Sequence, residues 1–271
     1  MFTLVRTNQY LIHMNTINSL LDKIEKAKAL DFGTIFNQSI ELFKKVWVQG
    51  LVMLLLTMLL MVPFYLIMYL PMLGMGLIDP QSFQNMENMQ DFTPLLMVPI
   101  FIFALLFSFF AMVISFGMKA SFYRICKLKD LEEMGADDYF YYLKKPYLGK
   151  VIKLSLVTFG IVLLAFALCV LPIFYVLVPV TLINVVFAFN PELSTSEVIK
   201  AGFKLGNKKW LITFGLLFVA WLLSTVIGFL MCCIGIYITK SFINLPVYFI
   251  YKESVGFDKK EDNQGYGMSY E

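Results

Sequence analysis

The strongest constraint on the fold is a set of long apolar stretches with almost no charge. One stretch runs from Trp47 to Ile78 and is followed, after a polar loop, by Leu95 to Met118. The other two are Val151 to Phe189 and Trp210 to Tyr251, each with a single charged residue. A helix needs about 20 apolar residues to cross the hydrocarbon core of a bilayer. The sequence therefore predicts an integral membrane protein in which the two longest stretches each form two helices.

Turn signals divide these stretches. Proline disfavours a helical conformation in the residue before it, so Leu171-Pro172 marks one turn. Met231 to Gly235 is the expected turn in the last stretch. The prediction is an all-α membrane fold in which six transmembrane helices form three hairpins. These spans cover about residues 47–70, 95–118, 151–170, 173–189, 210–230 and 234–251. The fourth span is short, so four spans plus a re-entrant hairpin is the alternative.

Composition excludes several function classes. Only 15% of the residues are charged, against about 25% in an average soluble domain. A net charge of +3 is too small to indicate binding to nucleic acid. The single histidine, His13, and four cysteines do not suit a zinc or di-iron site. No nucleophile elbow, zinc-protease motif or phosphate-binding loop is present, so we expect no catalytic residue, metal or cofactor.

The distribution of Lys and Arg predicts the orientation of the chain in the membrane. All but one of the 22 basic residues lie in four segments: the N-terminal part through Lys45, Lys119 to Lys153, Lys200 to Lys209, and the residues after Tyr251. The exception is Lys240. The loop between the first two spans has no basic residue. Both termini are therefore expected in the cytoplasm.

The two ends differ from the membrane domain, residues 31–251. Residues 1–30 are expected to form a cytoplasmic arm with a short helix, whose apolar positions are Ile17, Leu20, Leu21 and Ile24. Docking of this helix on the bundle is favoured over docking on a partner. Residues 1–13 lack the apolar core of a signal peptide and are either a disordered arm or a start-site artefact. Residues 252–271 are polar and are expected to be disordered.

The membrane domain shows a threefold internal repeat, over residues 31–118, 130–189 and 194–251. Each unit has an amphipathic segment, a basic and aromatic junction, and a helical hairpin. The segments share a spacing of four, three and four residues, which marks one face of a helix. Their positions are Phe36, Ile40, Phe43 and Trp47; Ala136, Phe140, Leu143 and Tyr147; and Ile199, Phe203, Gly206 and Trp210. The junction residues are Lys44, Lys45, Trp47, Lys144, Lys145, Tyr147, Lys208, Lys209 and Trp210.

The junctions have the chemistry of the membrane surface. A basic residue gains about 1 kcal/mol near anionic lipids, and an aromatic residue suits the water–lipid boundary. Each amphipathic segment is expected to be an interfacial helix with its apolar face toward lipid. Ser194 and Glu197 have the spacing of a capping box, which predicts where the third segment begins. Specific recognition of anionic head groups is one interpretation. Simple anchoring of each hairpin is the other, and it is favoured.

Three polar residues inside the spans are candidates for a polar path: Asn184, Lys240 and Asn244. A charge inside a membrane is costly unless it reaches the surface or finds a partner. Extension of Lys240 to the outer boundary, and hydrogen bonds from the asparagines between helices, are the favoured alternatives.

The small residues Ala220, Ser224 and Gly228 form a stripe on the fifth span, which permits close approach of another helix. Packing within the bundle is favoured over dimerisation.

Two motifs carry a resemblance to a known family. Asp31-Phe32-Gly33-Thr34-Ile35-Phe36 leads into Lys44-Lys45-Val46-Trp47, and Ser194-Thr195-Ser196-Glu197 leads through Ala201-Gly202-Phe203 to Lys209-Trp210. Over about residues 30–252 the pattern resembles the bacterial multi-span membrane domain associated with glycerophosphoryl diester phosphodiesterases and its stand-alone relatives. The resemblance implies a bacterial plasma membrane protein. No phosphodiesterase domain follows in this sequence, so that activity is not expected. Some such proteins are labelled carotene oxygenases, a family that resembles a propeller with four iron-binding histidines, which this chain lacks.

These observations predict a non-enzymatic membrane protein that is structural, lipid-interacting or partner-binding at the inner leaflet. Its expected partners are membrane lipids, among which anionic head groups are one candidate, and the sequence does not identify a protein partner. A transporter of small solutes or lipids, with a path near Lys240, is the main alternative. An intramembrane enzyme is a weaker one.

Overall fold

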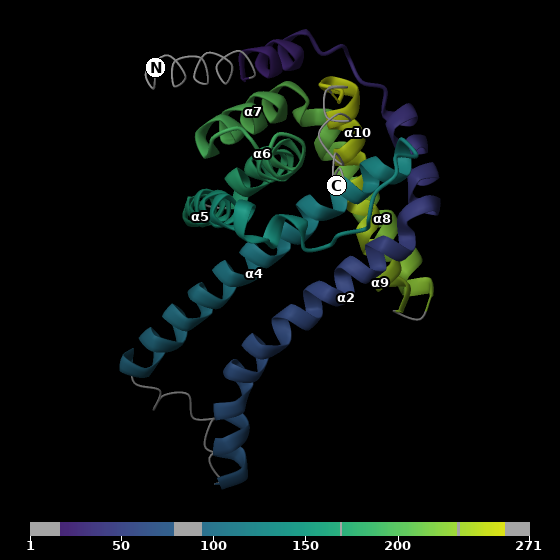
Figure 1. The fold of residues 1–271 in the computed structure, drawn as a ribbon. Helices are drawn as coiled ribbons and strands as arrows, with labels where there is room; N and C mark the ends of the chain where they lie inside the picture. Colours follow the sequence, from purple (N-terminus) through teal and green to yellow (C-terminus); the bar gives the residue numbers. More distant parts are fainter. Residues whose placement is uncertain (1–16, 79–93, 169, 232–233, 258–271) are drawn as a thin grey trace, which may run out of the picture. The chain divides into compact units, whose positions relative to one another are not determined.

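The computed structural model describes residues 17–78, 94–168, 170–231 and 234–257. These ranges are helical and contain no strand (Figure 1). A helix over residues 17–26 comes first. It is followed by α2 (Phe32–Ile78), α4 (Pro94–Asp130), α5 (Lys145–Ala167), α6 (Val170–Phe189), α7 (Thr195–Lys208), α8 (Trp210–Leu230), α9 (Ile234–Thr239) and α10 (Asn244–Ser254). Two short 3₁₀ helices are η2 (Tyr141–Leu143) and η3 (Lys240–Ile243).

Five helices have the length and apolar composition to cross a membrane. They cover Phe32–Ile67, Phe101–Asp130, Lys145–Ala167, Leu171–Phe189 and Trp210–Leu230. In the most apolar part of each, between 22% and 50% of the residues are buried, so at least half of these apolar residues are not enclosed by protein. A large apolar surface of this kind suits contact with lipid. The predicted class, an all-helical membrane protein, is confirmed to this extent.

The predicted sixth span, residues 234–251, is not one continuous helix. It is divided into α9, η3 and α10, with η3 beginning at Lys240. Pro246 gives a physical reason for the break, because a proline in a helix interior removes one hydrogen bond and clashes with the preceding turn. The new start at Asn244 places Pro246 in the first turn of α10, where no N–H is needed.

Helix α10 also differs from the others in being buried nearly all round. Its buried residues are Asn244, Leu245, Pro246, Val247, Tyr248, Phe249, Ile250, Tyr251 and Ser254. A helix without an exposed apolar face belongs to the interior of a fold.

The three segments predicted to be interfacial helices have different structures. The first is the beginning of α2, which continues without interruption to Ile78. Its buried positions are Ile35, Ser39, Leu42 and Val46, one residue before the predicted ones. The second is wrong as a helix, because residues 131–140 form turns and extended chain before η2. The third is a separate helix, α7, and its predicted capping box is present.

The chain divides into two compact units. The central unit comprises Val46–Ile173, and the terminal unit comprises Met1–Lys45 together with Phe174–Glu271. In the central unit, the Phe64 ring lies 5.5 Å from the Phe110 ring, and the Phe109 ring lies 5.8 Å from the Phe159 ring. In the terminal unit, the aromatic rings of Phe189, Tyr248, Tyr251 and Phe257 pack together around α10. The terminal unit therefore joins segments from both ends of the sequence.

Candidate functional site

The candidate site lies in the terminal unit, where α7 ends and α8 begins. We call Lys204, Lys208 and Lys209 the lysine cluster. Lys204 and Lys208 are one helical turn apart on α7, and Lys209 joins α7 to α8. Helical spacing of four residues places side chains on the same face, so the first two ammonium groups point in a common direction.

Glycines fix the position of α7. A Cβ atom added to Gly202 would lie 2.9 Å from the Cα of Ile183, and one added to Gly206 would lie 2.9 Å from the Cα of Pro179. Two glycines four residues apart thus allow α7 to rest directly on α6. Of the predicted apolar face of this segment only Gly206 is buried, and the buried side of α7 is formed by Val198, Ala201, Gly202, Leu205 and Gly206. The lysine cluster extends from other positions of α7 toward the helix of residues 17–26.

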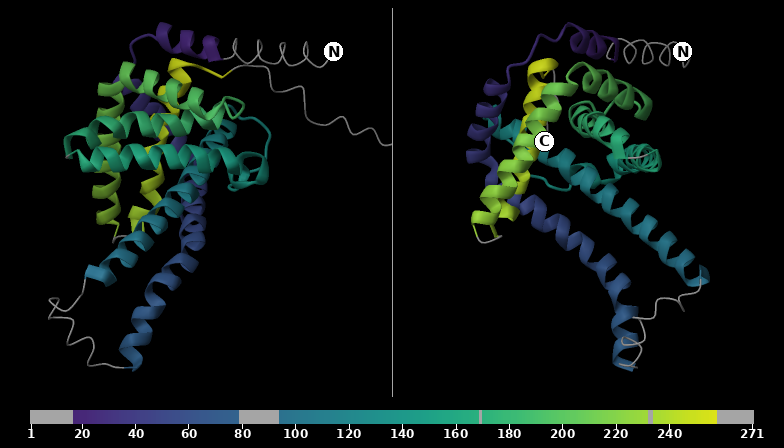
Figure 2. Two further views of the ribbon diagram at one scale, coloured as in Figure 1. Left: turned by 90° about the vertical axis from the view of Figure 1, so that its left-hand side faces the viewer. Right: turned by 180° about the vertical axis from the view of Figure 1, so that it is seen from behind.

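We call residues 17–26 the N-terminal helix. It lies beside α7 in both views of Figure 2. Its apolar residues Ile17, Leu20, Leu21 and Ile24 are all buried, and Ile24 has no exposed surface. The alternation of this buried side with exposed polar residues matches a helix docked on a protein surface. The structure thus has the intramolecular docking that the sequence favoured.

The lysine cluster binds the end of the N-terminal helix. The Lys204 ammonium lies 2.8 Å from a carboxylate oxygen of Glu25. Lys208 donates to the backbone carbonyl of Glu25, and Lys209 donates to the carbonyls of Lys28 and, at 3.3 Å, Ala27. The last carbonyls of a helix have no partner within the helix, and the helix dipole places partial negative charge there. Lys208 therefore caps this helix from outside, Lys204 binds the Glu25 side chain, and Lys209 binds the chain that follows the helix.

Burial and the closeness of like charges disfavour the positive charge of Lys209 in the lysine cluster. Lys209 is only 6% exposed. Burial, and secondarily the nearby Lys208 ammonium, hold the pKa of Lys209 below its usual range. The hydrogen bond and the charge of Lys204 lower the pKa of the exposed Glu25 carboxyl. One carboxylate and three neutral carbonyls thus face three ammonium groups.

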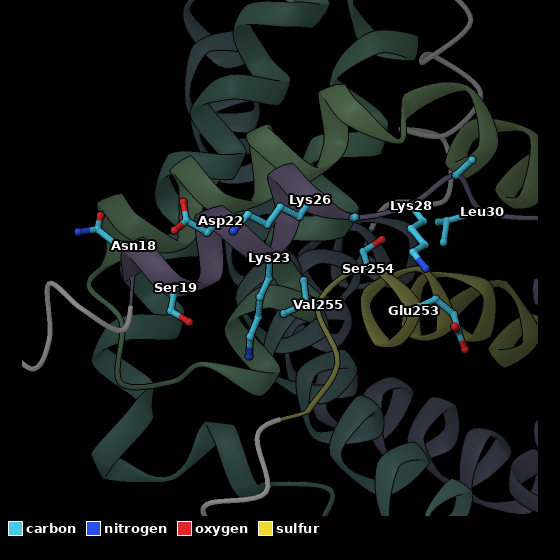
Figure 3. Close-up of a pocket in the computed structure, with 12 residues that line it drawn as sticks. Asn18, Ser19, Asp22, Lys23, Lys26, Lys28, Leu30, Glu253, Ser254 and Val255 are labelled. Atoms are coloured by element: carbon cyan, nitrogen blue, oxygen red, sulfur yellow. The ribbon is translucent and has the colours of Figure 1, made fainter.

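A groove of about 890 Å³ lies on the other side of the N-terminal helix (Figure 3). It is lined by this helix, by the following residues 27–30, and by Glu253, Ser254 and Val255 at the end of α10. Its lysines are Lys23, Lys26 and Lys28, and its carboxylates belong to Asp22 and Glu253. Because the groove contains both signs of charge, it does not select strongly for an anion.

The first two predicted junctions differ from the lysine cluster. Lys44 and Lys45 are exposed, and Lys44 pairs with Glu41 at 2.6 Å. Trp47 is 42% exposed. These residues thus remain accessible within α2, where its long apolar part begins.

The lysines of the second junction are likewise accessible, and its tyrosine stacks on a neighbouring tyrosine ring. Lys144 and Lys145 are exposed, and Lys144 pairs with Asp138. Tyr147 stacks on Tyr141 with ring centres 5.2 Å apart. Its side chain is partly buried.

Trp210, the aromatic residue of the third junction, is held within the terminal unit. Its indole N–H donates to the carbonyl of Tyr175 at 3.2 Å, and its ring stacks on Phe214 at 5.0 Å. With Lys208 and Lys209 bound to the N-terminal helix, the third junction has a different environment from the other two.

The three residues of the predicted polar path lie in different environments. Asn184 and Asn244 are 5% and 9% exposed, whereas the Lys240 side chain is exposed. The Asn244 amide donates to the carbonyl of Ser241 at 3.4 Å, within its own part of the chain.

The small-residue stripe faces α9. Ala220, Ser224 and Gly228 are buried. A Cβ atom added to Gly228 would lie 2.7 Å from the Cα of Ile236. In this structure the stripe is used for packing inside the chain, which is the favoured interpretation from the sequence.

Comparison with known proteins gave no matching family, no curated relative and no similar solved structure. Within the described ranges, no group of three or more His, Cys, Asp or Glu residues could hold a metal ion.

The sequence did not predict the capture of carbonyl groups by the lysine cluster. The basic residues were evident, but a lysine can donate either to a lipid phosphate or to a helix carbonyl. A second feature of the sequence is the amphipathic stretch over residues 17–24, whose apolar side needs a surface to cover it. Neither signal specifies that these two segments meet.

Proposed function

We propose that the chain is a multi-pass protein of the bacterial plasma membrane that binds anionic lipid head groups at the inner leaflet and has no reaction of its own. The supporting observation is the exposure of Lys44, Lys45, Lys144 and Lys145. Each pair stands two or three residues before an aromatic side chain; Lys44 and Lys45 precede the apolar part of α2, and Lys144 and Lys145 stand at the beginning of α5. Ammonium groups at that depth attract phosphate, and the aromatic ring suits the boundary.

The proposal includes both termini in the cytoplasm and six crossings. Five crossings would place the termini on opposite sides of the membrane. The concentration of lysines before α2 and after α10 favours the same side for both. The segment of α9, η3 and α10 would then provide the sixth crossing, with Lys240 extending toward the outer boundary. A reporter fused after Glu271 should be active only in the cytoplasm, and activity outside the cell would contradict this topology.

Lipid retention tests the binding function. The protein would be purified in mild detergent from cells that contain phosphatidylglycerol and analysed by native mass spectrometry. Loss of two surface lysines should weaken the retention of anionic lipid about tenfold or more, at about 1 kcal/mol for each residue. The variants are K44Q/K45Q and K144Q/K145Q. The matched control is K259Q/K260Q, which removes the same charge from the polar C-terminal residues. Equal retention by all three variants and the parent protein would refute the proposal.

The resemblance to the phosphodiesterase-associated membrane domain agrees with this proposal, since it too implies a membrane role without catalysis. The transporter alternative gains no support from the three residues of the predicted polar path. The Lys240 side chain is exposed, whereas Asn184 and Asn244 are buried.

A further inference from the structure

We infer that the lysine cluster, Lys204, Lys208 and Lys209, is a second binding site for an anionic lipid phosphate, and that the N-terminal helix occupies it as an internal competitor. This inference rests on the proposed function, because it assigns a further lipid site to the same membrane face. It explains why a set of lysines next to a membrane-entering tryptophan is bound to backbone carbonyls.

The position of the cluster favours a lipid ligand. Trp210 follows Lys209 directly and is the first residue of α8, a helix long and apolar enough to span a membrane. The cluster therefore stands where a span would enter the head-group layer. A phosphate at this depth brings a full negative charge and several acceptor oxygens.

The present ligands of the cluster are poorer than phosphate. Lys208 and Lys209 donate to neutral carbonyl oxygens, and Lys204 alone is paired with a carboxylate, that of Glu25. An ammonium group is attracted more strongly by the full negative charge of a phosphate than by the partial charge of a carbonyl oxygen. A buried ammonium beside a second ammonium, as in Lys209 and Lys208, gains most from a fully charged partner.

The N-terminal helix and a phosphate compete for the same ammonium groups, because Lys208 and Lys209 now donate to the carbonyls of Glu25, Ala27 and Lys28. Binding of lipid and docking of the helix therefore oppose each other. Linkage then requires that each weakens the other by the same factor. Release of the helix should increase lipid binding, and lipid should release the helix.

The first test measures lipid retention after release of the helix. L20D/I24D introduces two charges on the buried side of the helix and should detach it. N18D/S19D introduces the same charges at exposed positions of the same helix and is the matched control. We expect L20D/I24D to retain about tenfold more phosphatidylglycerol than the control. The gain should disappear when K204Q/K208Q/K209Q is added. No gain in L20D/I24D, or a gain that persists without the lysines, would overturn the inference.

The second test uses the unaltered full chain, so it does not depend on the folding of a variant. Hydrogen exchange of residues 17–28 is compared in nanodiscs of phosphatidylcholine alone and of phosphatidylcholine with phosphatidylglycerol. Exchange should be faster with the anionic lipid. Inorganic phosphate added to the neutral nanodiscs should have no effect. Equal exchange in both nanodiscs would overturn the inference, and release by inorganic phosphate alone would overturn the assignment to lipid.

The two proposals fail separately. Retention that is insensitive to Lys44, Lys45, Lys144 and Lys145 would refute the general lipid function. Retention that depends on those four lysines but not on the N-terminal helix would refute only the competition at the lysine cluster.

Discussion

The side chains of Ser224 and Thr239 bind each other's backbone. The Ser224 hydroxyl donates to the carbonyl of Thr239 at 3.0 Å, and the Thr239 hydroxyl donates to the carbonyl of Ser224 at 2.8 Å. Both residues are buried, and the pair joins the middle of α8 to the last residue of α9. Because η3 follows at once, this pair lies where the last apolar segment changes from an α-helix to a 3₁₀ helix.

Removal of this pair should destabilise the α8–α9 hairpin. Hydrogen bonds between membrane helices contribute about 0.6 kcal/mol on average, so S224A/T239V should lower the free energy of unfolding by about 1–2 kcal/mol. Unfolding in SDS would measure it. T225V is the matched control, because Thr225 bonds to Trp221 on its own helix. A double variant as stable as T225V would show that the pair contributes nothing.

Glycine replacements should separate close packing from helix propensity. G228A places a Cβ atom against the backbone of Ile236, and we expect it to lower the free energy of unfolding by about 1–3 kcal/mol. Gly160 on α5 has open space around its Cβ position. G160A should be neutral or stabilising by up to about 1 kcal/mol, since alanine is the better helix former. Thermal unfolding in one detergent would compare the two, and equal destabilisation would contradict the packing argument.

The beginning of α2 depends on Asp31. Its carboxylate accepts hydrogen bonds from the backbone N–H and the hydroxyl of Thr34, both at 2.7 Å. These bonds lower the pKa of Asp31. D31A should therefore increase hydrogen exchange in the first turn of α2 roughly fivefold, the usual effect of losing a helix cap. D31N keeps an acceptor and should change exchange less. Unchanged exchange in D31A would exclude the cap.

Acid should loosen the N-terminal helix. The pKa of Glu25 in the folded protein lies below its ordinary value near 4.5, mainly because of the hydrogen bond with Lys204. The stabilisation is therefore present above about pH 4.5 and is lost as the pH falls through the lowered pKa. Hydrogen exchange of residues 17–28 should rise in that range. In K204Q the rise should be smaller, and an identical pH dependence in K204Q would assign the effect to other groups.

Local signals in the sequence predicted the features that depend on a few neighbouring residues. The capping box of Ser194 and Glu197 is present because its partners are three residues apart. The long apolar helices follow from the length of each stretch, which does not require knowledge of the neighbours. The buried side of residues 17–24 likewise follows from helical spacing alone.

Contacts between distant segments were not predictable in this way. Glu25 and Lys204 are separated by 179 positions, and the lysine spacing does not distinguish a carbonyl from a phosphate. The beginning of α2 shows the same limit. Phe36 and Phe43 were expected on the apolar face, whereas the enclosed positions are Ile35, Ser39, Leu42 and Val46. Both phenylalanines instead pack edge-on against Phe242, from a segment close to the other end of the sequence.

The enclosure of α10 has a consequence for how the protein is made. The terminal unit draws its first part from residues up to Lys45 and its central helix from Asn244–Ser254, which leaves the ribosome after all the other described helices. The segments made earlier must therefore wait, with their inner surfaces uncovered, until α10 has been synthesised. Quality-control proteases would have their best opportunity during that interval, so premature termination just before Asn244 should yield a rapidly degraded chain.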